Sequence, residues 1–108
     1  MKKNKRQTDR VSPISPDYQD ERIGDIAVST AGHDAGLILV VVAGIDDKYV
    51  LVADGKRRKL IAPKKKSMQH LSMLTKLDAE DTEKLKKREA NDSFLYRKLS
   101  VLDLESFT

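Results

Sequence analysis

The segment "TAGHDAG", residues 30 to 36, holds residue types from which a catalytic or metal-binding loop could be built. His33 and Asp34 are adjacent in it, but a stable metal site needs three or four ligands at suitable spacing. The only other histidine, His70, lies 37 positions further along, and the chain has no cysteine to act as a ligand or nucleophile. We therefore expect no metal site.

Two other kinds of chemistry fit the same segment poorly. A phosphate-binding P-loop reads GxxxxGK[ST], whereas "GHDAGL" has a different spacing and lacks both the lysine and the hydroxyl residue. Nucleophilic catalysis needs a serine or threonine beside a placed base and an orienting acid. Ser29 and Thr30 lie near His33 and Asp34, but this composition is common in loops. The sequence predicts a protein that is not an enzyme and that uses no cofactor.

Positive charge is concentrated in two parts of the chain. Residues 56 to 66, "KRRKLIAPKKK", contain seven lysines and arginines and no acid, and residues 1 to 16 carry a net charge of +4. The segment between them has a net charge of −6, and the whole chain has one of +4. Scattered lysines mainly keep a small domain soluble, but a run this dense indicates a polyanionic partner such as a nucleic acid.

The chain of 108 residues is long enough for one small domain with tails. Residues 1 to 21 lack apolar periodicity and contain Pro13 and Pro16, which predicts a flexible basic arm. No apolar segment follows "MKKNKR", so we expect no secretion signal. The longest apolar run, residues 37 to 45, is too short for a membrane helix of roughly 20 residues. These features predict a soluble, cytoplasmic protein without membrane association.

Hydrophobic patterns predict four short strands. In "IGDIAVST", residues 23 to 30, apolar and polar positions alternate as in a half-buried strand. "LILVVVAGI", residues 37 to 45, is apolar and rich in β-branched side chains, which favours a central strand covered on both faces over a buried helix. "KYVLVAD" alternates again. Asp54-Gly55 is then a typical signal for a two-residue hairpin, followed by a basic strand, "KRRKLIA", that ends at Pro63.

Four short strands joined by tight turns cannot cover their apolar face as a flat sheet, so they should curl. We expect a mainly β fold, a small SH3-like barrel over residues 22 to 72. Residues 73 to 108 are predicted to form a helical extension. Asp78 precedes a charge-rich, solvated helix, and Asn91 precedes a second one. The second helix should dock on the barrel or on a partner through Phe94, Leu95, Leu99 and Leu102.

Residues 23 to 71 resemble a KOW motif in the form found in the ribosomal protein L14e-like family, especially in small bacterial KOW-domain RNA-binding proteins. In a KOW motif two strands flank a loop that carries a glycine, and apolar positions alternate after it. Gly36 matches that glycine, and Gly32 matches the earlier glycine of the G-x-x-x-G form. Val40 and Val42 match the apolar positions that follow, and "DDKYVLVADGKRRKL" extends the likeness.

The resemblance implies an SH3-like barrel that binds RNA, often ribosomal, through the KOW loop and neighbouring basic residues. The family often has Lys or Arg directly after the loop glycine, where this chain has Leu37. The charge would then come mainly from the basic run. His33 is either a hydrogen-bonding contact to RNA or simply an exposed loop residue. The residues expected to contact RNA are Gly32, His33, Gly36, Lys56, Arg57, Arg58, Lys59, Lys64, Lys65 and Lys66.

We therefore expect a non-enzymatic protein that binds ribosomal or other structured RNA and associates with the ribosome and translation. No aromatic residue lies within the basic run, so recognition of backbone and shape is expected rather than extended base stacking. The alternative is a protein-interaction module that recruits a translation or transcription partner through the barrel or the C-terminal helix.

Overall fold

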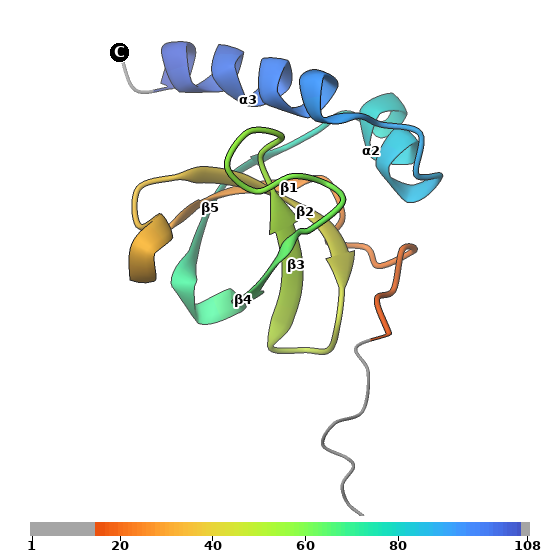
Figure 1. The fold of residues 1–108 in the computed structure, drawn as a ribbon, viewed down its shortest axis with the longest axis horizontal. Helices are drawn as coiled ribbons and strands as arrows, with labels where there is room; N and C mark the ends of the chain where they lie inside the picture. Colours follow the sequence, from red (N-terminus) through yellow and green to blue (C-terminus); the bar gives the residue numbers. More distant parts are fainter. Residues whose placement is uncertain (1–14, 107–108) are drawn as a thin grey trace, which may run out of the picture.

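The computed structural model describes residues 15–106. Its centre is one antiparallel sheet with the strand order β4-β3-β2-β1-β5, and the sheet is strongly curved (Figure 1). Among the described residues no ladder joins β4 to β5, so these two strands are the edges of an open sheet. In chain order the strands are β1 (Asp25–Ser29), β2 (Ile38–Gly44), β3 (Tyr49–Ala53), β4 (Lys64–Ser67) and β5 (Leu71–Lys76).

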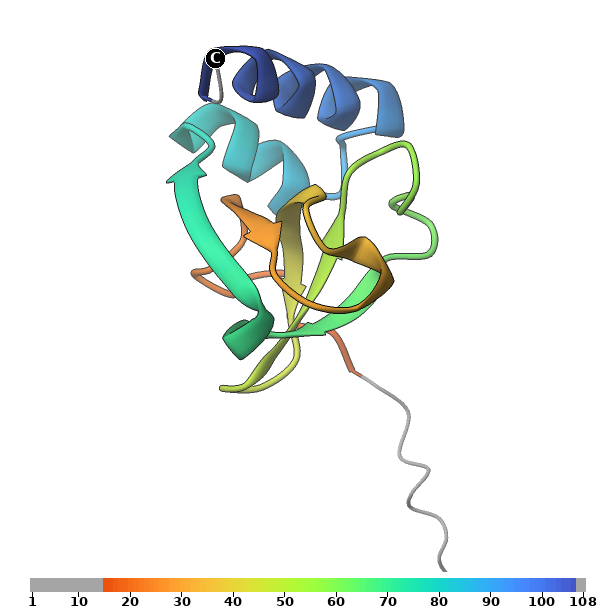
Figure 2. The ribbon, with the colours of Figure 1, turned by 90° about the vertical axis from the view of Figure 1, so that its left-hand side faces the viewer.

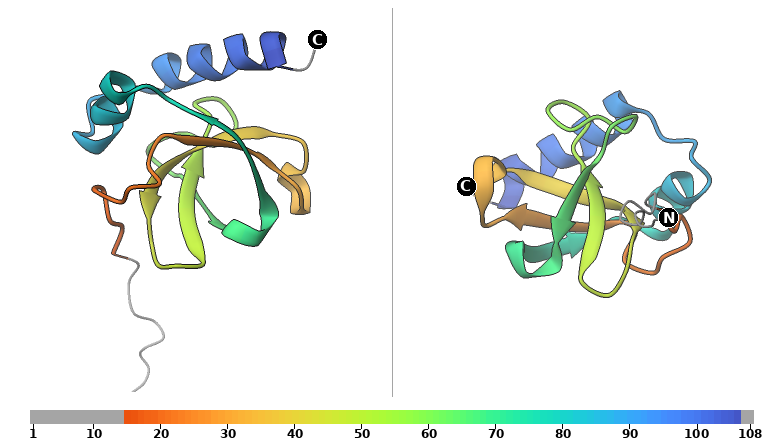
Figure 3. Two further views of the ribbon diagram at one scale, coloured as in Figure 1. Left: turned by 180° about the vertical axis from the view of Figure 1, so that it is seen from behind. Right: turned by 60° about the horizontal axis from the view of Figure 1, so that its bottom comes forward.

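Two helices follow the sheet, α2 (Ala79–Lys86) and α3 (Asp92–Ser106). Both lie at the same end of the curved sheet, as the view from behind also shows (Figure 3). No helix in the described part of the chain has the length and apolar character needed to cross a bilayer. The protein is therefore a small, mostly β domain with two C-terminal helices.

Two apolar clusters lie on either side of β2, because successive side chains of a strand point to opposite faces. Val40 and Val42 belong to a cluster that includes Leu95 and Leu99 of α3. Leu39 belongs to the other cluster, with side chains from β1, β3 and β5. The prediction of a central strand covered on both faces is confirmed. The apolar face of α3 docks on the domain's own core.

Both helices begin where the sequence predicts. The Asp78 carboxylate accepts a hydrogen bond from the backbone N–H of Asp81 at 2.8 Å. The Asn91 side chain accepts one from the N–H of Phe94, also at 2.8 Å. Each bond satisfies an N–H group that the first turn of a helix leaves without a partner. The two caps therefore fix the points at which α2 and α3 leave the preceding loops.

The basic run does not form the predicted strand. Residues 54–63 form a loop, and the strand that pairs with β3 is β4, which begins after Pro63 instead of ending there. The predicted two-residue hairpin is also wrong. Gly55 has a φ of 83°, but Asp54 lacks the positive φ that a type I′ turn requires at both central residues. The Asp54 side chain instead accepts hydrogen bonds from the loop that follows it, which holds the chain in a wider turn.

Two further predictions about the sheet need correction. β1 is covered on both faces, because Ile26 and Ala27 belong to different apolar clusters, so it is more than half-buried. A fifth strand, β5, was not predicted and contains the expected domain boundary at residue 72. It pairs with β1 as an edge strand, and all its residues after Leu71 are exposed. An exposed strand has no apolar alternation from which it could be recognised.

Residues 1–14 of the predicted flexible arm lie outside the described residues. Further along the arm, the backbone N–H and carbonyl of Asp17 form hydrogen bonds with Gly44, at 2.8 and 2.9 Å. Asp20 forms an ion pair with Arg22 at 2.8 Å. The chain is thus attached to the end of β2 from Asp17 onward.

Candidate nucleic-acid interface

The loop between β1 and β2, residues 30–37, is here called the glycine loop. Gly32 and Gly36 have φ angles of 78° and 91°, a left-handed conformation that side chains disfavour. The N–H of Gly36 donates to the carbonyl of Ser29 at 2.8 Å, which closes the loop. A Cβ atom added at Gly36 would meet nothing within 4 Å. Backbone conformation, and not close packing within the described chain, therefore requires the glycine at this position.

Asp34 joins the glycine loop to the basic segment, residues 56–66. Its carboxylate is only 7% exposed and lies 2.8 Å from the Lys64 ammonium, 3.1 Å from the Arg58 guanidinium and 3.7 Å from the Lys66 ammonium. Lys64, followed by Arg58, lowers the pKa of Asp34 below its ordinary value, although burial acts in the opposite direction. The structure thus brings together two parts of the predicted site that are far apart in sequence.

The cations of the basic segment fall into two groups. Arg58, Lys64 and Lys66 face Asp34, and Lys66 also donates to the carbonyl of Ala31 at 3.1 Å with only 6% of its side chain exposed. The other four are exposed, and none forms an ion pair with another described side chain. These outward-facing cations are Lys56, Arg57, Lys59 and Lys65.

The start of α3 holds the basic segment in place. The carboxylate of Asp92 accepts a hydrogen bond from the N–H of Leu60 at 2.8 Å. A Cβ atom at Gly55 would collide with the carbonyl of Asp92, so the loop can approach the helix only because this residue lacks a side chain. Figure 2 shows this loop (green) against the first turns of α3. Just before Gly55, Asp54 accepts hydrogen bonds from the N–H groups of Lys56 and Arg58, at 2.9 and 2.8 Å.

A shallow groove of about 410 Å³ runs between the glycine loop and the basic segment. The predicted site residues in it are His33, Gly36, Lys56 and Arg57. Tyr96 of α3 also lines it, and the Lys56 ammonium lies 5.2 Å from the centre of this ring. On β3, the ring of Tyr49 lies 4.4 Å from the Lys65 ammonium. Two aromatic rings therefore lie beside the basic segment, although none lies within it in sequence.

Sequence reasoning missed the roles of Asp34, Asp92 and Tyr96. A run of seven cations without an acid does signal that any internal charge partner must come from another part of the chain. It does not identify that partner, because Asp34 lies 24 positions before Arg58 and Asp92 lies 32 positions after Leu60. No local pattern connects Tyr96 with the basic segment. These roles become visible only in the folded arrangement.

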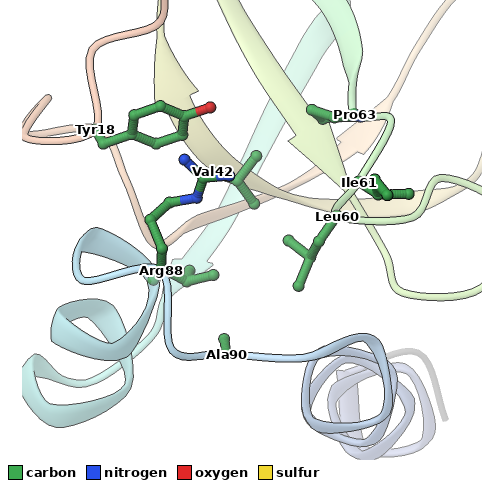
Figure 4. A pocket seen from close by; sticks show the side chains of 8 residues that line it. Tyr18, Val42, Leu60, Ile61, Pro63, Arg88 and Ala90 are labelled. Carbon is green, nitrogen blue, oxygen red and sulfur yellow. The ribbon is translucent and has the colours of Figure 1, made fainter.

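Another hollow, of about 250 Å³, lies beside the middle of the basic segment (Figure 4). The Arg88 guanidinium lies 4.1 Å from the centre of the Tyr18 ring in its wall, and Leu60 points inward. Arg88 has a φ of 63°, a conformation in which glycine is usual at the end of a helix. The lining residues are Tyr18, Val42, Leu60, Ile61, Pro63, Leu85, Arg88 and Ala90, none of them an acid or a histidine.

Within residues 15–106, no three or more His, Cys, Asp or Glu side chains gather in a way that could hold a metal ion. A comparison with protein-family models gives no match for the chain. A search among curated proteins gives no match either.

Proposed function

We propose that this is a non-enzymatic RNA-binding protein that contacts the backbone of structured RNA, such as ribosomal RNA, through the basic segment and the glycine loop. The observation that carries the proposal is that the seven cations of the basic segment fall into an inward-facing group and an exposed group. Three of them surround Asp34 and fix the segment, whereas Lys56, Arg57, Lys59 and Lys65 remain exposed. Lys56 and Arg57 lie beside the glycine loop, and Lys65 lies on the side of β4 opposite to Lys66. Exposed cations on an ordered segment can contact the negative charges of a phosphate backbone.

We also propose that the curved sheet is an SH3-like barrel with a KOW motif, and the strand order supports this. Consecutive strands from β1 to β4 pair antiparallel, and β5 returns to pair with β1. A single 3₁₀ turn, Met68–His70, connects β4 to β5. This connectivity is the one we expect of an SH3-like barrel. The glycine loop lies between β1 and β2, where the resemblance puts the KOW loop.

The salt dependence of RNA binding tests the proposal. The variant Arg57→Ala/Lys59→Ala/Lys65→Ala removes three exposed cations that form no ion pair within the described side chains, so we expect it to fold normally. Each cation that neutralises a phosphate adds about 0.7 to 0.9 to the slope of log K against log salt concentration. The slope for a stem-loop RNA, measured by fluorescence anisotropy, should therefore become shallower by about 2.

A control variant removes the same amount of charge elsewhere. Lys48, Lys87 and Arg97 are also exposed, on the β2–β3 turn, the end of α2 and the outside of α3. Changing these three residues to alanine should leave most of the slope intact. Equal slopes for the two variants would show that RNA responds only to net charge, and the basic segment would lose its assigned role.

The surface that motivated the alternative function is largely used within the molecule. Leu95 and Leu99 are 0% and 4% exposed in the core beneath α3, and Leu102 packs against the same cluster. A partner recruited by α3 would have to contact its outer face, where Val101 is 52% exposed. The structure therefore gives stronger support to the RNA-binding proposal than to a protein-interaction module.

A further inference from the structure

Tyr96 separates two adjoining hollows of opposite character. The shallow groove described above carries His33, Lys56 and Arg57. An adjoining hollow of about 220 Å³, distinct from the one in Figure 4, continues along α3 and is lined by Ile38, Leu99 and Ser100. The two hollows share four residues: Gly36, Leu37, Asp54 and Tyr96. A cationic half and an apolar half thus meet at one aromatic ring that is 42% exposed.

We propose that this pair of hollows binds one unpaired nucleotide of the RNA, with its base stacked on Tyr96 and its phosphate beside Lys56 and Arg57. This inference rests on the proposed function and names a ligand for part of the same surface. An unpaired nucleotide has a flat apolar base and a charged phosphate. The apolar half of the site suits the base, and the cationic half suits the phosphate. Aromatic rings in RNA-binding proteins commonly hold unstacked bases in this way.

Leu37 gains a role in this arrangement. The resemblance to KOW proteins leads us to expect a cation after the loop glycine, yet Leu37 lines both hollows. An apolar side chain beside an exposed ring favours a base over a phosphate at that point. The cationic half of the site is supplied instead by Lys56 and Arg57, from the other loop.

Two features of the groove act against a bound nucleotide: a lysine that already lies over the Tyr96 ring, and two carboxylates in the lining. Neither prevents binding. The Lys56 ammonium lies over the Tyr96 ring at 5.2 Å, but an exposed contact of this kind is weaker than stacking of a base on an aromatic ring. The exposed lysine can then turn toward the phosphate. The carboxylates of Asp34 and Asp54 also line the groove, but both are buried. The first is surrounded by cations, and the second accepts two backbone hydrogen bonds.

The test compares two RNA probes, a hairpin with an unpaired loop and a blunt duplex with the same number of phosphates. Tyr96→Ala should weaken binding of the hairpin by a factor between about 5 and about 150, the range for losing one stacked base. Binding of the duplex and the salt slope should not change. Tyr96→Phe keeps the aromatic face and should bind like the wild type. Tyr96→Leu, which fills much of the same space without a ring, should behave like Tyr96→Ala.

Thermal unfolding of each variant checks that the fold is retained. An unchanged hairpin affinity in Tyr96→Ala and Tyr96→Leu would overturn the inference. An equal loss for hairpin and duplex would also overturn it, because the ring would then act only by positioning the basic segment. In both cases the proposed function survives. If the wild-type protein binds neither RNA, the proposed function fails, and the nucleotide site fails with it.

Discussion

The carboxylate of Asp34 and the ammonium of Lys66 are both nearly buried, with 7% and 6% of their side chains exposed. Lys66 has two charge-compensating neighbours, this carboxylate at 3.7 Å and the carbonyl of Ala31 at 3.1 Å. Arg58 and Lys64 complete the cluster from partly exposed positions. Removing one partner from a buried ion pair leaves the other charge uncompensated, and this cost exceeds the net value of the pair itself.

Asp34→Asn should therefore lower the free energy of unfolding by about 3 kcal/mol, measured by denaturant titration. The second variant for a double-mutant cycle is Lys66→Met. It removes the ammonium that Asp34→Asn leaves without a carboxylate partner, and it keeps most of the side-chain volume. The double variant should be less destabilised than the sum of the two single variants, with a coupling of about 1 kcal/mol or more. Additive effects would show that the two charges do not depend on each other.

The pH dependence of stability gives a second readout of the same cluster. The pKa of Asp34 is lowered in the folded protein, so below about pH 4 the unfolded chain binds more protons than the folded one. The contribution of Asp34 is fully present above the unfolded pKa and is lost as the pH falls through the folded pKa. The difference in unfolding free energy between wild type and Asp34→Asn should therefore shrink below about pH 4. A difference that stays constant down to pH 2 would contradict this assignment.

At the scale of elements, the basic segment depends on α3. The contact between the Asp92 carboxylate and the N–H of Leu60 joins the loop to the first turn of the helix, and Gly55 packs against the same residue. Three carboxylates, from the glycine loop, the end of β3 and the start of α3, thus hold the basic segment. The C-terminal helix therefore positions the candidate RNA-binding surface in addition to covering the core.

Asp92→Ala should loosen the loop without unfolding the domain. Losing one hydrogen bond of about 1 kcal/mol should raise the hydrogen-exchange rate of the Leu60 amide by a factor of about 5. Asn91→Ala is the control, because it removes the helix cap at Phe94 but no contact to the loop. In that variant exchange should increase in the first turn of α3 and remain slow at Leu60. Equal protection of Leu60 in all three proteins would mean that Asp92 does not hold the loop.

Elements whose signals are local could be predicted from the sequence. The central strand and the caps at Asp78 and Asn91 follow from an apolar run or from side chains that bond to nearby backbone. The fourth strand was misplaced, because the position of β4 depends on pairing with β3. β5 was missed because its exposed residues carry no pattern. Long-range contacts decide these positions, and a local pattern does not contain them.

The candidate site shows the same limit. Its cations are apparent in sequence, but their division into an inward and an outward group is not. Lys66 was grouped with Lys65 as a phosphate contact, yet alternation along β4 turns Lys66 toward Asp34 and leaves Lys65 exposed. Neighbouring lysines in one strand thus face different surroundings, which only the strand's pairing reveals.

At the scale of the whole molecule, the net charge of +4 understates the field that a polyanion would meet. Residues 56–66 alone carry seven cations, and within the described side chains the one carboxylate that forms ion pairs with them belongs to the glycine loop. The surplus of positive charge is therefore fixed in space by the fold and not spread over the surface. A local surplus of positive charge attracts a polyanion and steers its approach.

Crosslinking of protein to RNA in living cells, followed by sequencing of the attached RNA, tests the central claim most directly. The wild-type protein should yield RNA well above background, enriched in structured species such as ribosomal RNA. Arg57→Ala/Lys59→Ala/Lys65→Ala should lose most of this signal, whereas Lys48→Ala/Lys87→Ala/Arg97→Ala should retain it. Recovery of RNA at background level from the wild type, or equally from all three proteins, would contradict an RNA-binding role for the basic segment.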